Sequence, residues 1–444
     1  MHLMRLGCVA FLLLGFAIAG ARHGQLLDFR MAHGSAKCLL QNCDPYNQSD
    51  LAHMYFAENG EKPTDKTAAG ILDDETRYIY LPTVFAFTLP FAILPVSVAQ
   101  GIWIATIAGS FILASFLMWN LAASHSPLLS GALLCFCLAN SGSLISSANP
   151  GGIAISLCIV AAWCFLKERF VTAGIVCLAI SLMLKPHDTG LVWLYFVLAG
   201  GMFRKRALQS LSVFGVLSLP TVLWVFHISP NWIKEIQSNM LALSAHGSVS
   251  DPSPAFVLGR GTFMITDLQA VISFFWDDPK FYNSVSYFVC ILLLAVWIFV
   301  TLRSRPLQNS PWFALAAVSA LSMLPFYHRQ YDARLVILTI PACALLWAEG
   351  GLAGRLALLV NSVGFFLIAD LPWAFALSFI HSHLPSAAGL SRQIVSAAVA
   401  FPVPLILLTM CVFYLRVYAK RAFHPIAHEE SSTSTTDQTE QLPI

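Results

Sequence analysis

Charged residues are scarce in this chain of 444 residues. Asp, Glu, Lys and Arg make up only 11% of it, whereas 57% of its residues are hydrophobic and the mean hydropathy is +0.71. In soluble globular domains about a quarter of the residues are charged. This composition therefore excludes a soluble globular domain. The formal net charge of +2 is too small to indicate a nucleic-acid partner. The sequence therefore predicts an all-α, polytopic membrane protein.

Three other patterns are missing. No glycine-rich phosphate loop of the P-loop or Rossmann kind occurs, which disfavours a nucleotide-linked substrate. The eleven cysteines show no metal-ligand spacing, and most lie in apolar runs, where a thiol acts as a small hydrophobic group. No repeat relates one half of the chain to the other, although many transporters have one. A polytopic transporter or lipid flippase nevertheless stays open as an alternative.

Apolar runs are abundant, and many have the length of about 17–25 residues that an α-helix needs to cross a bilayer. The first, 6–21, ends in small residues as a signal peptide does, but the many runs behind it favour a retained helix. The others lie at 101–121, 127–147, 151–167, 170–184, 189–203, 207–227, 283–302, 311–327, 334–348, 355–380 and 393–415. The sequence therefore predicts about twelve spans.

Basic clusters between these runs predict the orientation, because Lys and Arg in short loops mark the cytoplasmic side. The clusters are Lys167/Arg169, Arg204/Lys205/Arg206, Arg303/Arg305, Arg355 and Arg416/Lys420/Arg421. Two spans separate each from the next, so all share one face, and that face is cytoplasmic only if the apolar stretch 80–98 does not cross. Pro82, Pro90 and Pro95 disfavour a straight spanning helix there. We expect 80–98 to re-enter or lie in the interface of the plasma membrane, with both termini cytoplasmic.

The same count places the unusual polar segments on the outer face. They are the first loop, 22–100, the long loop, 228–282, and the short strings at 149–152, 185–188 and 327–334. In the first loop, Cys38 and Cys43 can pair if that side is oxidising. Residues 1–421 form one transmembrane domain, and the polar segment 422–444 is predicted to be a disordered cytoplasmic tail.

A series of short motifs occurs in an order that resembles the motif order of glycosyltransferase family 87, a family of the GT-C superfamily. The motifs are DF at 28–29, CDPY at 43–46, Y-x-Y-x-P at 78–82, NPGG at 149–152, LKP at 184–186, DPSPAF at 251–256, the pair Leu268-Gln269 and YHRQYDARLVILTIP at 327–341. The resemblance covers most of residues 5–350. Two departures are Leu81, where the family often carries a second proline, and YHRQYD, where relatives often show a serine-tryptophan-histidine pattern.

This resemblance implies an inverting hexosyltransferase with a GT-C-like fold. Its donor would be a polyprenyl-phosphate sugar, mannose by family default, and its acceptor a lipid or glycan on the outer face. It implies that Asp28, just past the first helix, is the general base. No cofactor is implied, and the DF string offers one carboxylate rather than two, which argues against metal dependence. The apolar carrier would enter from the membrane lipids near 80–98.

The charged residues of the motifs allow a chemical and a structural interpretation. A carboxylate that takes the acceptor's proton contributes about 10²–10⁴-fold, but Asp28 at a helix end can equally bind local backbone amides. Lys185 is the candidate partner of the leaving phosphate, although a lysine at a helix end often only snorkels. His328 and Arg329 are candidates to share the phosphate or orient the acceptor. Asp332 has a direct role or pairs with Arg329 or Arg334.

Aromatic and loop residues complete the predicted substrate site. Asp44 and Tyr46 either contact a sugar, with the ring stacked on it, or form a plain turn. Tyr80 and Tyr331 lie in matched motifs and belong to the predicted binding set. The NPGG string at 149–152 offers backbone amides for an anion or is only a tight turn. The long loop 228–282 keeps an oligosaccharide polymerase or ligase open as a further alternative, and Asp370 has no assigned role.

Overall fold

The structure is a computed structural model, and it describes residues 1–21, 26–59, 73, 76–248, 250–254, 265–304, 310–371 and 401–423. Within these residues the chain is helical and has no strand. The only bridge of the β type there joins Ile265 to Arg329. This confirms the predicted all-α class for the part of the chain that is described. Most of the polar tail, from residue 424 onward, lies outside the described residues.

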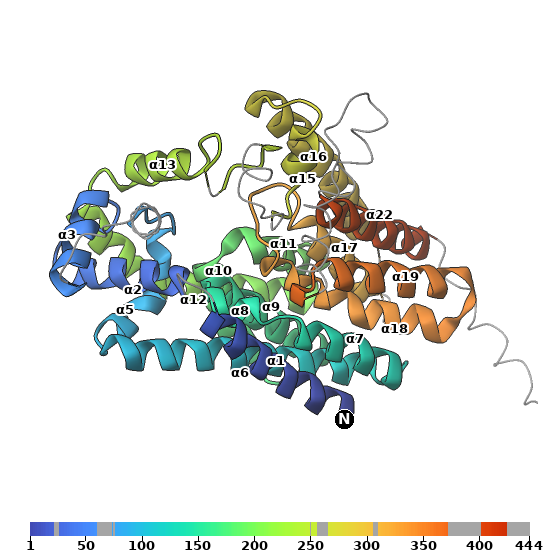
Figure 1. The fold of residues 1–444 in the computed structure, drawn as a ribbon. Helices are drawn as coiled ribbons and strands as arrows, with labels where there is room; N and C mark the ends of the chain where they lie inside the picture. Colours follow the sequence, from blue (N-terminus) through green and yellow to red (C-terminus); the bar gives the residue numbers. More distant parts are fainter. Residues whose placement is uncertain are drawn as a thin grey trace, which may run out of the picture.

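The helices follow one another along the chain, and Figure 1 shows their arrangement. In order they are α1 His2–Ala21, α2 Leu27–Leu40, α3 Gln48–Asn59, η1 Pro82–Val84, α5 Phe85–Ala92, α6 Val96–Ala122, α7 Pro127–Ala139, α8 Ser143–Ser147, α9 Pro150–Lys167, α10 Val171–Leu184, α11 Pro186–Ala199, α12 Gly201–Ile228, α13 Trp232–Leu243, α15 Leu268–Ser273, α16 Pro279–Arg303, α17 Ser310–Leu321, η2 Asp332–Leu338, α18 Thr339–Glu349, α19 Gly351–Leu367 and α22 Pro402–Phe423.

Seven helical stretches of the described chain are long and apolar enough to cross a membrane, which confirms a helical membrane protein. They are formed by α1, α6, α7 with α8, α9, α12, α16 and α22. The other predicted spans fall on shorter helices such as α10 and α11, each of 14 residues, about 21 Å long. A hydrocarbon core is about 30 Å thick. The structure therefore supports seven spans, and the count of twelve stays a prediction.

The short helices end where the sequence breaks them. Lys185 separates α10 from α11, because Pro186 begins a new helix and the residue before a proline is disfavoured in helical conformation. Gly350 and Gly351 join α18 to α19 with φ angles of 79° and 71°, a backbone region that favours glycine. These breaks lie between predicted runs, and the helices on either side are short.

The apolar stretch 80–98 does not form one continuous helix. It contains η1 and α5, which together run from Pro82 to Ala92 and rise only about 16 Å, roughly half of a hydrocarbon core. The chain then turns at Pro95, and α6 begins at Val96, five residues earlier than predicted. This helical segment is shorter than a full span, which agrees with its prolines, and that it does not cross stays a prediction.

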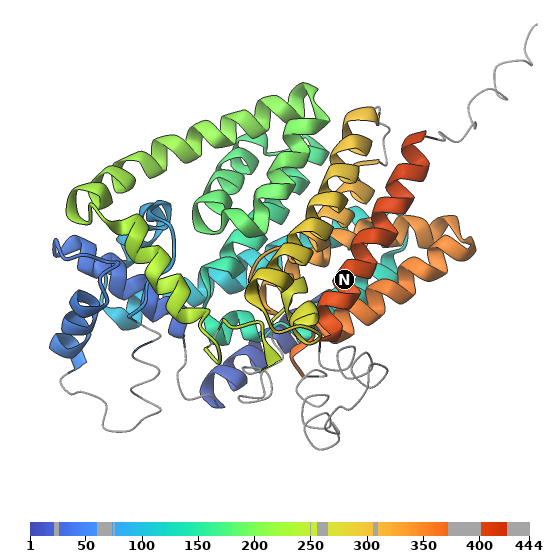
Figure 2. The ribbon, with the colours of Figure 1, turned by 90° about the horizontal axis from the view of Figure 1, so that it is seen from above.

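The basic clusters, apart from Arg305, which lies outside the described residues, gather at one end of the molecule, as predicted. Arg206 bonds the carbonyl of Phe165 at 2.9 Å and Glu168 at 3.1 Å, which joins two clusters. Ser304 meets the Tyr418 hydroxyl at 2.8 Å, and Arg421 pairs with Glu349. In Figure 2, α12 begins and α16 and α22 end along the upper edge of the view. The side of the membrane that this end faces stays a prediction.

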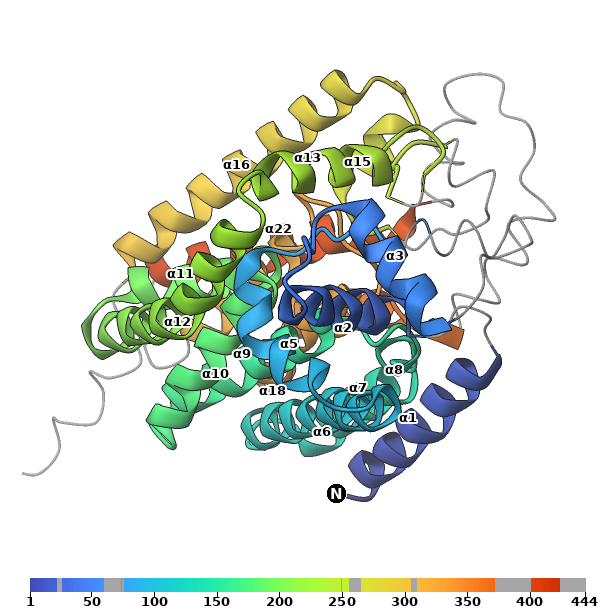
Figure 3. The ribbon, with the colours of Figure 1, turned by 90° about the vertical axis from the view of Figure 1, so that its left-hand side faces the viewer.

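Helices of the first loop and of the long loop form a layer at the opposite end, which we call the loop layer (α2, α3, η1, α5 and α13). Figure 3 shows this layer in front of the longer helices. Asn239 of α13 joins the two loops, since its amide donates to the carbonyls of Tyr46 and Tyr78, each at 3.1 Å. Cys38 and Cys43 form a disulfide at the end of α2, which agrees with an oxidising compartment on this side.

Candidate functional site

Asn149 is the centre of the candidate site. Ala148 takes a left-handed conformation after α8, and Asn149 then caps α9 by accepting the Gly151 amide at 2.7 Å. The side-chain nitrogen of Asn149 donates to the hydroxyls of Tyr80 and Tyr331, each at 3.0 Å. The NPGG turn therefore holds together two predicted binding residues from segments that are far apart in the sequence.

Asp28 lies beside Asn149 in the first turn of α2. The start of this helix is fixed by the Leu26 amide, which donates to the Ser146 carbonyl at 3.1 Å. Burial raises the pKa of the Asp28 carboxyl, while a hydrogen bond from Asn149 and the positive charges of Arg329 and Lys185 oppose the rise without cancelling it. Asp28 as a residue is only partly buried. A carboxylate with a raised pKa suits a general base.

Lys185 lies between two carboxylates. Its Nζ is 2.7 Å from Asp332 Oδ1 and 3.4 Å from Asp188 Oδ2, and its side chain is only 8% exposed. Burial lowers the pKa of Lys185, but the two carboxylates outweigh this and the net pKa is raised, so the ammonium keeps its charge. Lys185 thus does not snorkel to the surface.

Gly151 is required by the close approach of this ion pair. A Cβ at this position would lie 2.6 Å from Asp332 Oδ1, 2.8 Å from Asn149 Oδ1 and 3.0 Å from Lys185 Cδ. Real Cβ atoms do not approach other atoms so closely, so any side chain would displace the Lys185–Asp332 pair. The NPGG string is therefore more than a tight turn.

His328 packs against the first turn of α11. Its Nε2 is 2.9 Å from Asp188 Oδ1, and His187 Nε2 is 3.3 Å from the same oxygen. Its Nδ1 lies 2.8 Å from the Phe326 carbonyl, and its backbone carbonyl accepts the Thr266 amide at 3.0 Å. His328 is completely buried, whereas the side chain of His187 is 40% exposed.

Arg329 supplies an accessible positive charge. Its guanidinium bonds the Tyr327 hydroxyl and lies 5.8 Å from the centre of that ring, while its backbone amide donates to Asp332 Oδ2 at 3.1 Å. The side chain is partly exposed. Arg329, Asp28 and His187 are thus the members of the site that reach its surface.

We call this set the Asn149 cluster: Asp28, Tyr80, Asn149, Lys185, His187, Asp188, His328, Arg329, Tyr331 and Asp332. Seven of the nine predicted site residues belong to it. The sequence did not assign a role to His187 or Asp188, although both belong to the polar string after α10. Their adjacency to Lys185 was the available signal, since buried acids next to a buried lysine pair with it.

Asp44 and Tyr46 do not belong to the cluster. Asp44 Oδ1 accepts the Tyr46 amide at 2.9 Å and closes a local turn. The Tyr46 ring is buried among aromatic rings, with centroids 5.3 Å from Tyr78 and 5.9 Å from Trp232, and its hydroxyl donates to the Tyr80 carbonyl at 2.9 Å. Asp44 and Tyr46 therefore match the plain-turn interpretation. The Tyr46 hydroxyl connects the loop layer to Tyr80.

Asp332 pairs with Lys185 at 2.7 Å and also accepts the backbone amide of Arg329 at 3.1 Å, whereas Arg334 lies against another acid. Arg334 instead meets Asp370 at 2.9 Å, and the Ser143 amide and hydroxyl each donate to Asp370 at 2.7 Å. Asp370 is therefore the partner of a buried arginine, a role that its position within an apolar run did not reveal.

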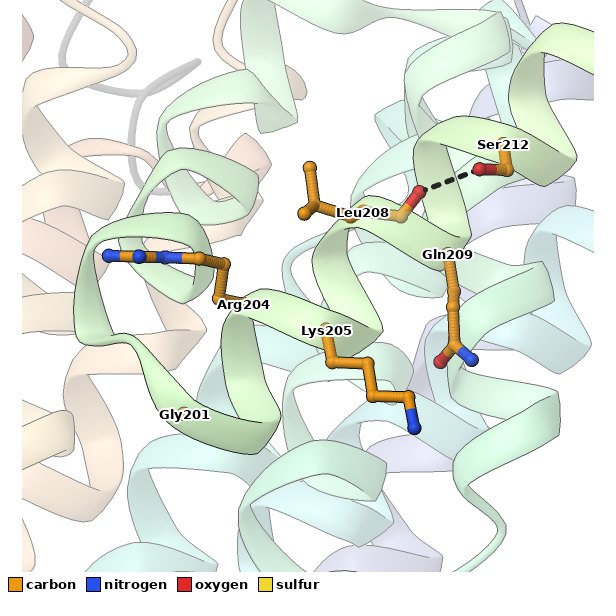
Figure 4. Close-up of a pocket in the computed structure, with 6 residues that line it drawn as sticks. All are labelled: Gly201, Arg204, Lys205, Leu208, Gln209 and Ser212. Carbon is orange, nitrogen blue, oxygen red and sulfur yellow. Dashed lines mark hydrogen bonds between the residues drawn. The ribbon is translucent and has the colours of Figure 1, made fainter.

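A shallow hollow of about 390 Å³ lies elsewhere, at the start of α12. Figure 4 shows its lining, which comes from this one helix and includes Arg204 and Lys205. It lies at the basic end of the molecule and shares no residue with the Asn149 cluster, so we do not identify it with the candidate site.

The cluster combines three carboxylates, from Asp28, Asp188 and Asp332, with the charges of Lys185 and Arg329 and the hydroxyls of two tyrosines. No protein-family model matches the chain, and no curated protein and no solved structure matches it significantly.

Proposed function

We propose that this protein is a membrane glycosyltransferase that moves a hexose, mannose first among the candidates, from a polyprenyl-phosphate donor to a lipid or glycan acceptor on the outer face. The observation that carries the proposal is the presence of Asp28 in one cluster with Lys185 and Arg329. A general base beside fixed positive charges is what transfer from a phosphate-linked sugar requires.

The reaction assigns a role to each group. The acceptor hydroxyl oxygen attacks the anomeric carbon and loses its proton to the Asp28 carboxylate. The bond between that carbon and the phosphate oxygen breaks, its electron pair stays on the phosphate, and the configuration inverts. Arg329, which is partly exposed, would contact the phosphate, while the buried Lys185 would stabilise its growing charge from behind. Tyr80 and Tyr331 would line the sugar.

The corner between α5 and α6 supports lateral entry of an apolar carrier. Ile93, Val96 and Val98 are all exposed there, Ile93 by 73%, as expected of side chains that face lipid tails. Thr83 of the same segment donates to the Met183 carbonyl at 2.9 Å, two residues before Lys185. An isoprenoid chain lying along this corner would present its phosphate toward the cluster.

The proposal is tested with the purified chain in liposomes. Radiolabelled polyprenyl-phosphate mannose and polyprenyl-phosphate glucose are supplied as donors, with GDP-mannose as the comparison and a membrane lipid and glycan extract as acceptor. We expect labelled product from a lipid-linked donor and none from the nucleotide sugar. Movement of the lipid across the bilayer without transfer of its sugar would favour the flippase alternative instead.

A further inference from the structure

Three potential metal ligands converge at the first turn of α11. His187, Asp188 and His328 each offer one ligand atom, and these atoms lie within 4.8 Å of one another. The two printed separations, 2.9 Å between His328 and Asp188 and 3.3 Å between His187 and Asp188, are near the spacing of about 3.3 Å between ligands of a tetrahedral ion with bonds of about 2.0–2.1 Å. The chain brings the ligands together across 140 residues.

The hydrogen bonds of His328 prepare its ring for a metal. Nδ1 faces the Phe326 carbonyl at 2.8 Å, and a carbonyl can only accept, so Nδ1 carries the proton. In the neutral ring, Nε2 then presents its lone pair. This arrangement, a backbone carbonyl on one ring nitrogen and a metal on the other, is how metal-binding histidines are oriented.

Buried polar atoms at this site lack aligned hydrogen bonds. Among the described residues, neither oxygen of Asp188 nor Nε2 of His328 has an aligned hydrogen-bond partner, although all three atoms are buried. A lone pair and a carboxylate oxygen 2.9 Å apart repel unless a proton or a cation lies between them. The side chain of His187 is 40% exposed, which gives an ion a path from the surface to these atoms.

Lys185 is compatible with a bound ion. Its ammonium lies 3.4 Å from Asp188 Oδ2, the oxygen that does not face the histidines, and its shorter contact of 2.7 Å is with Asp332. A ligating carboxylate commonly binds an outer partner through its second oxygen. Asp188 can therefore bind an ion through Oδ1 while Lys185 holds Oδ2.

We propose that His187, Asp188 and His328 bind a divalent first-row transition ion, of which Zn²⁺ is the best match. Two imidazoles and one carboxylate with an open position suit Zn²⁺ or Fe²⁺ and do not suit Mg²⁺ or Ca²⁺, which prefer oxygen ligands. The DF string suggested no metal because these ligands come from other segments. The inference is independent of the proposed sugar transfer.

The test measures metal binding directly. The full chain is purified through a tag without histidine, treated with a chelator and titrated with Zn²⁺ by calorimetry, and Co²⁺ is added separately to record visible absorption. We expect one ion per chain, and a Co²⁺ spectrum that the zinc abolishes. His187→Ala, which changes an exposed side chain, should weaken Zn²⁺ affinity at least about tenfold, in the range for loss of a metal-site residue.

Two controls complete the test. His53→Ala removes an exposed histidine of α3 in the loop layer, and its Zn²⁺ affinity should equal that of the parent. Asp188→Asn keeps the size of the side chain and should also weaken binding. Failure of the parent to bind Zn²⁺ or Co²⁺, or equal affinity in His187→Ala, would overturn the proposal and leave a proton between His328 and Asp188.

Discussion

Two buried acids of this protein, Asp370 and Asp188, show how differently a charge can be held. Asp370 accepts two hydrogen bonds from Ser143 and pairs with Arg334, so both of its oxygens are satisfied. Asp188 is completely buried, yet neither oxygen has an aligned hydrogen bond among the described residues. Burial alone is therefore no sign of function, whereas an incompletely satisfied buried charge near accessible groups is a reason to look for a ligand.

This comparison of Asp370 with Asp188 predicts that their cationic partners, Arg334 and Lys185, are equally important for stability but differ in their effect on sugar transfer. Arg334→Met and Lys185→Met each leave buried carboxylates without their partner, which costs about 3–5 kcal/mol. Both variants should therefore lose thermal stability in detergent. Sugar transfer per folded molecule should fall only in Lys185→Met, with weaker donor binding, because only Lys185 lies in the cluster. An equal loss of specific activity in Arg334→Met would break the distinction.

Gly151→Ala tests the close packing of the cluster. The added Cβ would meet Asp332 and Asn149 oxygens at 2.6 and 2.8 Å, and overpacking of this kind costs about 1–3 kcal/mol. We expect a lower melting temperature and reduced transfer, measured on the same preparation. Gly215→Ala in α12 is the matched control, since nothing lies within 4 Å of its added Cβ, and its stability should not decrease.

The pH dependence of sugar transfer tests whether Asp28 is the general base. Burial raises the pKa of this carboxyl, and a base acts only when ionised, so activity should be lost as the pH falls through a midpoint above that of an ordinary aspartate. Arg329 lowers the pKa of Asp28. Arg329→Gln should therefore shift the acid limb of kcat/KM to higher pH, and an unchanged limb would assign it to another group.

The sequence predicted those features that depend on local composition. Apolar runs identified the long membrane helices, and the prolines of 80–98 agree with the short helical segment found there. That this segment does not cross and that the basic end faces the cytoplasm stay predictions. The breaks at Lys185 and Gly350 fall between predicted spans, but hydropathy did not show how short the helices beside them are. Run length therefore overestimated several helices.

Pairings across long sequence distances could not be predicted from composition. Lys185 and Asp332 pair although they are 147 residues apart, and Arg334 pairs with Asp370 rather than with Asp332, which is nearer in the sequence. The packing of η2 against α9 and α17 helps to decide which charges meet. Motif order brought most of the site residues to attention, but Tyr46 shows that an aromatic residue in a motif can equally be a packing residue.

The transfer rate of Asp28→Asn tests the central claim most directly. Asparagine keeps the shape and polarity of the side chain but cannot take the acceptor's proton, so turnover should fall about 10²-fold or more while donor binding and melting temperature stay near the parent's. Asp277→Asn, which changes an exposed acid of the long loop, should keep parental turnover. Retention of more than about a third of parental turnover by Asp28→Asn would contradict the assignment of Asp28 as the base.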